Sequence, residues 1–142
     1  MADRPKIVIV GGGFAGLQAA RVLGRRDDVA VAVVDRRNHH VFQPLLYQVA
    51  TAALSPGDIA SPIRWILRRQ QNVSVLLADV VRIDAEHKCL ELSDGDPLPF
   101  DYLIVAAGVT HAYFGDDAWR DTRPGLKTMG DALHIPPRIL LP

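Results

Sequence analysis

Residues Lys6–Gly16 read KIVIVGGGFAG, and this stretch decides the fold. The short apolar run Lys6–Val10 is stopped by three glycines, which is typical of a buried parallel strand. From Phe14 to Leu23 apolar residues recur at helical spacing, with arginines toward the end. The sequence therefore predicts a strand, a tight turn and a helix in immediate succession.

The glycines at positions 11, 13 and 16 have the G-x-G-x-x-G spacing of a dinucleotide-binding turn. Gly11 is expected to let the chain turn sharply out of the strand, and Gly13 to let the backbone touch a diphosphate. Gly16 is expected to let the helix pack closely on the strand. The amides of Phe14 and Ala15 lie at the positive end of that helix, where an anion is held without a lysine.

Asp35 ends the next predicted strand, Val29–Val34, and completes a β-α-β unit of about thirty residues. A carboxylate at this strand end accepts hydrogen bonds from the ribose hydroxyls of an adenosine. The alternative is an ordinary aspartate at the end of a strand. A cofactor with a 2′-phosphate is disfavoured because its charge would meet this carboxylate, although Arg36 and Arg37 would soften the repulsion.

The segment Asn38–Ala53 has neither helical nor strand periodicity, and Pro44 interrupts it. Its flat and amide side chains fit two interpretations: a loop that lines the site of a ring system, or a packed surface loop. A helix is expected over Ile59–Gln70, after two Ser-Pro pairs that are typical of helix starts. Trp65 stands among arginines on this helix, where a solvated face is favoured over a membrane-surface helix.

Three short strands are expected next, followed by a turn at Asp94-Gly95-Asp96 that leads toward Leu98–Phe100. These segments predict a small antiparallel flap, with Cys89 as a small apolar residue in it. The strand candidates are Val73–Leu77, Val80–Ile83 and Cys89–Leu92.

Tyr102–Ala106 is expected to return to the buried sheet, and Ala107-Gly108 ends it where a backbone can approach a ligand. A further helix is expected to start at Met129–Ile135, and Pro136-Pro137 is expected to stop it. The predicted fold class is α/β: a Rossmann-like parallel sheet with a small antiparallel β flap.

With 142 residues, the chain is expected to form one domain, residues 1–142. Sixteen basic residues balance sixteen acidic ones, so no net charge favours nucleic acid or an acidic membrane. The single cysteine excludes an internal disulfide or a redox-active pair, and no histidine has metal-ligand spacing, so no metal is predicted. No leader or membrane-spanning run is expected, and a cytoplasmic location follows.

Several stretches together resemble the amino-terminal part of type II NADH dehydrogenases, the non-proton-pumping NADH:quinone oxidoreductases. They are VIVGGGFAGLQAARVL, VVDRRNHHVFQPLLYQVATAALSPGDIASPIR, DYLIVAAG and GLKT, within roughly residues 5 to 135. The segment HVFQPLLYQVATAALSPGDIA is more specific than the glycines.

The resemblance implies that this nucleotide fold holds FAD. Gly11, Gly13 and Gly16, with Phe14 and Ala15, would then meet the diphosphate. Other positions follow from the same resemblance: Asp35 with Arg36 at the adenosine ribose, Val81 near the adenine, Gln43, Pro44 and Leu45 near the isoalloxazine ring, and Ala107 with Gly108 closing over the cofactor.

The family transfers hydride from NADH to FAD and then reduces a quinone. No side chain here is a convincing proton donor or nucleophile, so no catalytic residue is predicted. Relatives have a threonine where this chain has Ala107, which implies weaker FAD binding. Gly130-Asp131 resembles a motif that closes the FAD site in related flavoproteins, but a helix-start turn is the preferred interpretation.

Relatives continue with a second, NADH-binding fold and a membrane-attaching part, so this chain is expected to be a truncated form that binds FAD weakly or not at all and lacks NADH:quinone activity. Peripheral membrane association belongs to the full-length family and is not expected of this chain. The alternatives are a non-catalytic or vestigial dinucleotide-binding domain and a fragment of another two-dinucleotide reductase. Disulfide-type reductases need redox cysteines, and NAD-dependent short-chain dehydrogenases need a Tyr-x-x-x-Lys; both are missing here.

Overall fold

The computed structural model describes residues 4–116, 118–123 and 125–140. Within this range the chain forms two compact units. The first unit comprises residues 4–40 and 62–108, and the second comprises residues 41–61 and the described part of 109–140. The chain crosses from one unit to the other after His40, after Ser61 and after Gly108. Two short strands at the first two crossings pair with each other, β3 (His39–Val41) and β4 (Ala60–Pro62).

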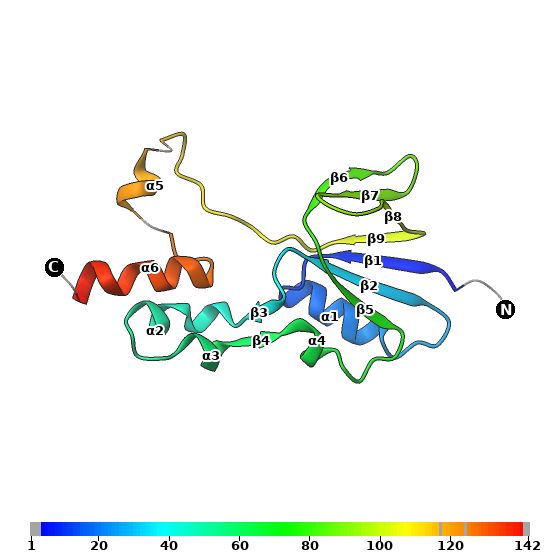
Figure 1. Ribbon diagram of the computed structural model, residues 1–142, viewed down its shortest axis with the longest axis horizontal. Helices are drawn as coiled ribbons and strands as arrows, with labels where there is room; N and C mark the ends of the chain where they lie inside the picture. Colours follow the sequence, from blue (N-terminus) through cyan, green and yellow to red (C-terminus); the bar gives the residue numbers. More distant parts are fainter. Residues whose placement is uncertain (1–3, 117, 124, 141–142) are drawn as a thin grey trace. The chain divides into compact units, whose positions relative to one another are not determined.

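The first unit is built on a four-stranded sheet with the order β5-β2-β1-β9 (Figure 1). All three strand pairs are parallel, as the near-continuous apolar runs predict. The strands are β1 (Lys6–Val10), β2 (Ala30–Asp35), β5 (Val73–Leu77) and β9 (Tyr102–Val105). The Rossmann-like parallel sheet is therefore confirmed, and α1 (Phe14–Leu23) connects β1 to β2 as expected.

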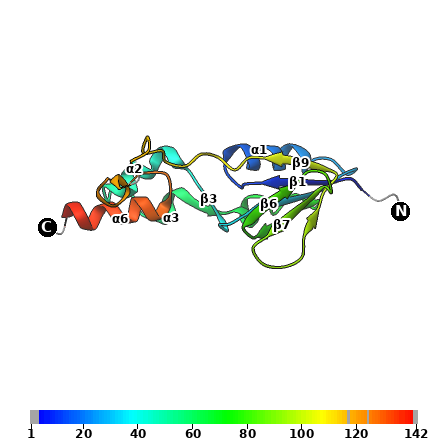
Figure 2. The same ribbon diagram turned by 90° about the horizontal axis from the view of Figure 1, so that it is seen from above.

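The central strands bury both of their faces, and alternate residues serve two different cores. Ile9 and Val33 point to one side, where they pack with Leu17 of α1 and with Ile63. Val8 and Val34 point to the other side, and the second core also contains Leu90 and Phe100. Figure 2 shows α1 and the antiparallel strands on opposite faces of the sheet.

The antiparallel flap is confirmed as a three-stranded sheet in the order β6-β7-β8. Its strands are β6 (Val80–Asp84), β7 (Cys89–Leu92) and β8 (Leu98–Pro99). Gly95 has φ +89° in the turn between the last two strands, a conformation that favours glycine. Placing Val73–Leu77 in the flap was wrong, because this strand pairs in parallel with β2, from Val31↔Val73 to Asp35↔Leu77.

The helix expected over Ile59–Gln70 is shorter than predicted, since α4 comprises Ile63–Ile66. Ser61-Pro62 belongs instead to β4, because a residue before proline is driven toward extended backbone. The predicted inward side is nevertheless right: Ile63 and Leu67 are buried in the core beside α1, and Ile66 packs against it.

The second unit packs α2 (Leu46–Ala50) against a longer helix, α6 (Met129–Leu140). Its core contains Leu46, Val49, Ala50, Ile59 and Ala132. The short elements are the 3-10 helix η1 (Gln43–Leu45), α2 (Leu46–Ala50), α3 (Pro56–Ile59) and α5 (Trp119–Thr122).

Two expectations for the second unit were therefore wrong. The segment Asn38–Ala53 is not irregular throughout, because residues 46–50 form a short helix. Leu46, Val49 and Ala50 lie on one face of this helix and are buried, and five residues are enough to form such a face. The helix that begins at Met129 does not stop at Pro136-Pro137 but includes both prolines. The proline ring fixes φ at a helical value, so the prolines remove hydrogen bonds without forcing the chain out of the helix. No helix in the described residues is long and apolar enough to cross a membrane.

A reciprocal capping arrangement starts α6. The Asp131 carboxylate accepts hydrogen bonds from the backbone N–H groups of Thr128 (2.7 Å) and Lys127 (3.0 Å), and the Thr128 hydroxyl accepts the N–H of Asp131 (3.1 Å). The interpretation of Gly130-Asp131 as a helix-start turn is thus confirmed. Burial raises the pKa of the Asp131 carboxyl, but the hydrogen bonds from Lys127, Thr128 and His111 outweigh it, so the pKa lies below its usual range.

Replacing Asp131 by Ala is expected to lower the free energy of unfolding by about 1 kcal/mol at neutral pH, because the backbone N–H groups of Lys127 and Thr128 lose their acceptor. The folded carboxyl has the lower pKa, so its stabilisation is complete above the unfolded value, near 4, and is lost as pH falls through the folded value. Thermal unfolding from pH 7 to pH 2 should show the two proteins converging in acid. A difference that persists undiminished at pH 2 would contradict this assignment.

Candidate dinucleotide-binding site

The candidate site lies in the first unit, where the carboxyl ends of β1 and β9 meet the turn into α1. In the order β5-β2-β1-β9, the chain continues from β1 to β2 on one side, and β9 lies on the other. Open parallel sheets bind ligands at such a point, outside the carboxyl ends of the strands. Gly11 N–H donates to the Val34 carbonyl at 2.8 Å, and Ala106 N–H donates to the Val10 carbonyl at 2.8 Å. The three strand ends are therefore tied together.

Two of the three motif glycines are required by packing. Gly11 has φ +105°, and a Cβ there would overlap the carbonyl of Ala106. A Cβ on Gly16 would overlap the Gly11 carbonyl and touch the side chain of Ile9. These are the steric roles that the sequence predicts for Gly11 and Gly16.

Gly13 differs from the other two. Its backbone is in an ordinary extended conformation, with φ −75°, and a Cβ there would meet nothing within 4 Å. It is also the N-cap of α1, and no side chain caps the helix. Neither strain nor internal packing requires glycine here, so the space above it fits a group from outside the chain. Phe14 and Ala15 follow it in the first turn of α1.

Asp35 lies beside this turn, as its position at the end of β2 requires. One carboxylate oxygen accepts the N–H of Gly12 at 2.6 Å, and the other accepts the N–H of Arg37 at 2.7 Å. A carboxylate has about four acceptor positions, so these two bonds leave capacity for hydroxyl groups of a ligand. The side chain thus holds the glycine turn in place and remains able to accept a ribose hydroxyl.

His40 also contacts the glycine turn, a position that was not predicted from the sequence. Its Nδ1 lies 3.2 Å from the Gly12 carbonyl oxygen, and its ring meets that of Phe14 edge-on, with centroids 4.8 Å apart and planes at 87°. Since a carbonyl accepts, Nδ1 must carry the proton in this contact. The two contacts fix both the peptide after Gly12 and the first residue of α1. The contact joins residues that are 28 positions apart, so no local pattern in the sequence predicts it.

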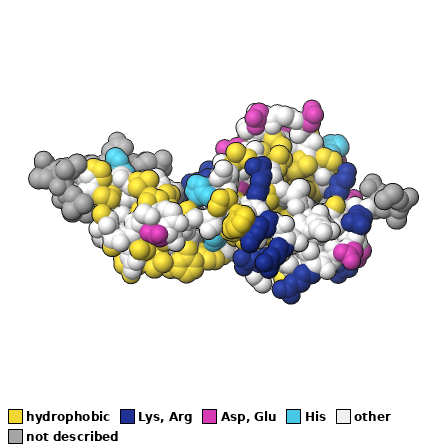
Figure 3. Space-filling view, turned by 60° about the horizontal axis from the view of Figure 1, so that its bottom comes forward, with side chains coloured by type: hydrophobic (Ala, Val, Ile, Leu, Met, Phe, Trp, Pro, Cys, Tyr) yellow, Lys and Arg dark blue, Asp and Glu magenta, His cyan; other side chains and the backbone are white. Residues whose placement is uncertain are grey.

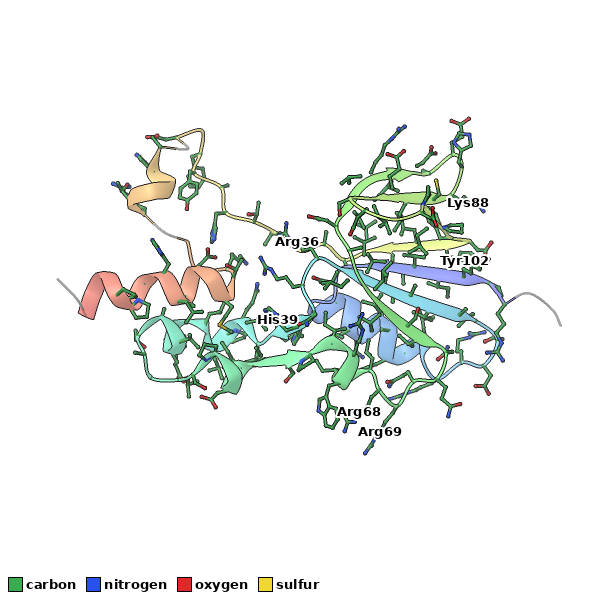
Figure 4. All side chains as sticks on the ribbon, viewed as in Figure 1. Arg36, His39, Arg68, Arg69, Lys88 and Tyr102 are labelled. Carbon is green, nitrogen blue, oxygen red and sulfur yellow. The ribbon has the colours of Figure 1, made fainter. Side chains whose placement is uncertain are left out.

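The other predicted residues of the first unit are exposed around the same strand ends or on the flap. Figure 4 shows Arg36 at the carboxyl end of β2. Ala107 and Gly108 are exposed after β9, and Gly108 has φ +74° with no atom within 4 Å of a Cβ. Val81 lies on β6 with 63% of its surface exposed.

Gln43, Pro44 and Leu45 belong to the second unit, where they form η1. The side-chain amide of Gln43 donates to the Lys127 carbonyl at 3.1 Å. Leu45 packs against the core of that unit, whereas Gln43 and Pro44 are exposed. Their role beside a flavin ring stays a prediction. Among the described residues, no group of three or more His, Cys, Asp or Glu side chains is placed to hold a metal ion.

The model of the pyridine nucleotide-disulphide oxidoreductase family matches residues 5–134, which include the whole candidate site of the first unit. The chain belongs to this family. Its members are flavoproteins that bind FAD and use a pyridine nucleotide, so the FAD expected from the sequence is confirmed for the family.

Two relatives from Mycobacterium tuberculosis confirm the resemblance to type II NADH dehydrogenases. The type II NADH:quinone oxidoreductase Ndh is 48% identical over 140 residues, which are 96% of this chain and 30% of the relative. NdhA, another type II NADH:quinone oxidoreductase, is 49% identical over an alignment of 143 positions that covers 99% of this chain and 30% of the relative. The chain therefore spans about a third of the length of these relatives.

The structure of NDH2 from Plasmodium falciparum in complex with NADH has the same fold. It superposes with a TM-score of 0.85 and 25% sequence identity, covering 97% of this chain and 29% of that protein. A sulfide:quinone oxidoreductase from Aquifex aeolicus has a TM-score of 0.83 at 19% identity, covering 96% of this chain and 32% of that protein, which shows a shared fold alone.

Gly16→Ala is expected to lower the free energy of unfolding by about 2–3 kcal/mol, because its Cβ overlaps backbone that cannot move without opening the turn. Gly13→Ala is the matched control within the same motif. It should unfold within about 0.5 kcal/mol of the parent in the absence of ligand, since its Cβ meets open space. Denaturant unfolding of the three proteins measures both values, and equal losses at the two positions would contradict the division of roles.

His40→Ala is expected to cost about 1 kcal/mol of unfolding free energy, because the Gly12 carbonyl loses a donor and Phe14 loses a ring contact. His40→Asn is the comparison, since its side-chain amide places a donor near the position of Nδ1. Recovery of part of the loss by Asn in chemical denaturation would support the hydrogen bond. If the His40→Asn and His40→Ala variants were equally destabilised, the hydrogen bond to the Gly12 carbonyl would contribute nothing to stability.

Proposed function

We propose that this chain forms the FAD-holding part of a type II NADH:quinone oxidoreductase, with residues 1–142 as the amino-terminal portion of its FAD/NAD(P)-binding domain. The observation that carries the proposal is Gly13. Neither backbone strain nor packing within the chain requires a glycine at this position. Gly13 lies at the start of α1, which no side chain caps, and the Asp35 carboxylate at the end of β2 binds the neighbouring Gly12. The relatives named as NADH:quinone oxidoreductases support the same assignment.

In this proposal the backbone around Gly13, with the amides of Phe14 and Ala15, holds the diphosphate of FAD. The open space at Gly13 lets the phosphate oxygens approach the main chain, and the positive end of α1 offsets their charge. Gly11 and Gly16 act before binding, because they let strand and helix come close enough to form the turn.

Asp35 orients the adenosine half through its remaining acceptor positions, and the exposed Arg36 lies beside it. Val81 near the adenine and Ala107 with Gly108 over the cofactor complete the contacts of the first unit. Gln43, Pro44 and Leu45 are assigned to the flavin ring because of the resemblance to the family. When bound, FAD supplies the acceptor for hydride from NADH and the donor of electrons to a quinone.

The chain's own residues provide binding and orientation, and we assign none of them a catalytic role. The 142 residues contain one G-x-G-x-x-G motif, so a second dinucleotide site for NADH needs sequence beyond them. The 142-residue chain by itself is expected to bind FAD weakly and not to oxidise NADH. A cytoplasmic location fits a protein that uses NADH, and we propose it for this chain.

The alternative is a vestigial domain that keeps the fold but no cofactor. Titration of the purified chain with FAD, followed by removal of free flavin, separates the two. Retained flavin absorption supports the FAD assignment, and a protein that stays colourless supports the vestigial domain.

Gly13→Ala should weaken FAD binding at least about tenfold, equivalent to roughly 1.4 kcal/mol, because its Cβ occupies the approach of the diphosphate. Gly57→Ala is the control: it lies in α3, and its Cβ would meet nothing closer than the Ser55 hydroxyl at 3.8 Å. Flavin fluorescence titration measures the dissociation constants. If the Gly13→Ala variant bound FAD with unchanged affinity, the assignment of the diphosphate to this turn would be wrong.

A further inference from the structure

The glycine turn itself offers only main-chain donors to a ligand. Residues 11–16 contain no lysine or arginine, although Lys and Arg side chains gather on one face of the first unit (Figure 3). Within the turn, an anion is bound by backbone N–H groups, and each of them helps only if it points toward the anion. The direction of the peptide groups therefore decides how well the turn binds a diphosphate.

The peptide group between Gly12 and Gly13 is the one that local sequence leaves most free to rotate, because a glycine stands on each side of it. The peptide groups before and after it are held by other contacts. The Gly12 N–H donates to Asp35 at 2.6 Å, and the Gly13 carbonyl accepts the N–H of Leu17 at 2.9 Å, in the first turn of α1. The direction of the Gly12–Gly13 peptide thus depends on what binds the Gly12 carbonyl.

His40 binds that carbonyl. Its Nδ1 lies 3.2 Å from the Gly12 oxygen, and its ring lies edge-on to the ring of Phe14. The backbone that leads to His40 is anchored as well, since the Asn38 carbonyl accepts the N–H of Ile63 at 2.9 Å and the Ile63 side chain is fully buried. The imidazole therefore has a fixed place from which it restrains the peptide.

The C=O and N–H of a trans peptide point in opposite directions. With the Gly12 carbonyl on His40, the Gly13 N–H is directed away from the imidazole. A Cβ on Gly12 would overlap the side chain of Ile63, whereas a Cβ on Gly13 would meet nothing within 4 Å. The turn is thus filled by the chain at Gly12 and open at Gly13, where a ligand can approach the directed N–H.

We propose that His40 is a positioning residue of the diphosphate site. By holding the Gly12 carbonyl, it directs the Gly13 N–H toward the diphosphate of FAD. This role rests on the proposed function and adds to it a residue that acts through Gly12. Without the imidazole, the peptide can turn over, and the Gly12 carbonyl oxygen then faces the diphosphate oxygens in place of a donor.

Packing of the imidazole is the competing explanation. The edge-on contact with Phe14, at 4.8 Å between ring centroids, could support the start of α1 without any hydrogen bond. In that case an aromatic ring at position 40 is enough for FAD binding. The positioning role instead requires a donor near the place of Nδ1. A ring without a donor and a donor without a ring therefore give opposite results under the two explanations.

Three variants of the 142-residue chain separate these explanations: His40→Ala has neither group, His40→Phe keeps a ring, and His40→Asn keeps a donor. Flavin fluorescence titration measures their FAD dissociation constants, and circular dichroism confirms that each is folded. His40→Ala and His40→Phe should each weaken binding about tenfold, since a hydrogen bond to a charged group is lost. His40→Asn should bind within about threefold of the parent.

His39→Ala is the matched control. It removes the same ring from the neighbouring position, and successive side chains of β3 point to opposite faces. This variant should bind FAD as the parent does. A loss of affinity in His39→Ala equal to that in His40→Ala would overturn the proposal, because it would show that any change in β3 disturbs the site.

The direction of the peptide can also be measured without a ligand. Residual dipolar couplings of the Gly13 N–H in the isotope-labelled chain should agree between parent and His40→Asn, and should be reduced or reversed in His40→Ala and His40→Phe. A parent chain that does not bind FAD would contradict the proposed function, whereas the couplings test the restraint by His40 separately. Couplings unaffected by loss of the donor, or parent-like FAD affinity in His40→Phe, would overturn the positioning role.

Discussion

The first unit depends on the close approach of three backbones at one point. The Gly11 carbonyl lies where a Cβ on residue 16 would be, and the Ala106 carbonyl lies where a Cβ on residue 11 would be. Strand β1, helix α1 and strand β9 therefore meet without any side chain between them. Everything assigned to the site follows from this contact, because it places the start of α1 beside the end of β2.

The same contact explains why the strands are buried on both faces. Because α1 packs against β1, alternate side chains of β1 and β2 are buried on the face that α1 covers. The other side chains lie on the opposite face, which needs a cover of its own. The flap provides that cover through Leu90 and Phe100. The antiparallel strands thus belong to the core of the parallel sheet. This packing stabilises an insertion that has only three short strands.

Sequence patterns predicted the elements whose burial is continuous. β1 and α1 have the predicted bounds, because an apolar run followed by glycines allows few alternatives. Prediction from sequence patterns failed where a short strand could pair with either of two neighbouring strands. Val73–Leu77 fits an antiparallel pair as well as a parallel one by composition, and its pairing with β2 depends on a long-range contact.

The other two wrong predictions concern helices that contain proline. One helix is shorter than predicted and the other is longer. The helix predicted over Ile59–Gln70 includes Pro62, but in the structure Pro62 ends a strand before a single turn of helix. Pro136-Pro137 was expected to end a helix that in fact includes it. Proline fixes φ but leaves ψ free, so the local sequence leaves open which element it joins. The side chain of His40 was missed for a related reason: its contact with the Gly12 carbonyl spans 28 residues and has no local signature.

Asp35 shows how one residue can belong to both the fold and the site. Its carboxylate holds Gly12 and Arg37 through their amides, so the acid that would meet the ribose also sets the position of the turn that would meet the diphosphate. Two halves of a dinucleotide site are then coupled through a single side chain. His40 adds a second restraint on the same peptide, from the carbonyl side of Gly12. With its N–H held by Asp35 and its C=O held by His40, Gly12 cannot rotate, and the flanking Gly11 and Gly13 keep fixed directions. The site is therefore organised by the chain itself before any ligand arrives, which lowers the entropy cost of binding.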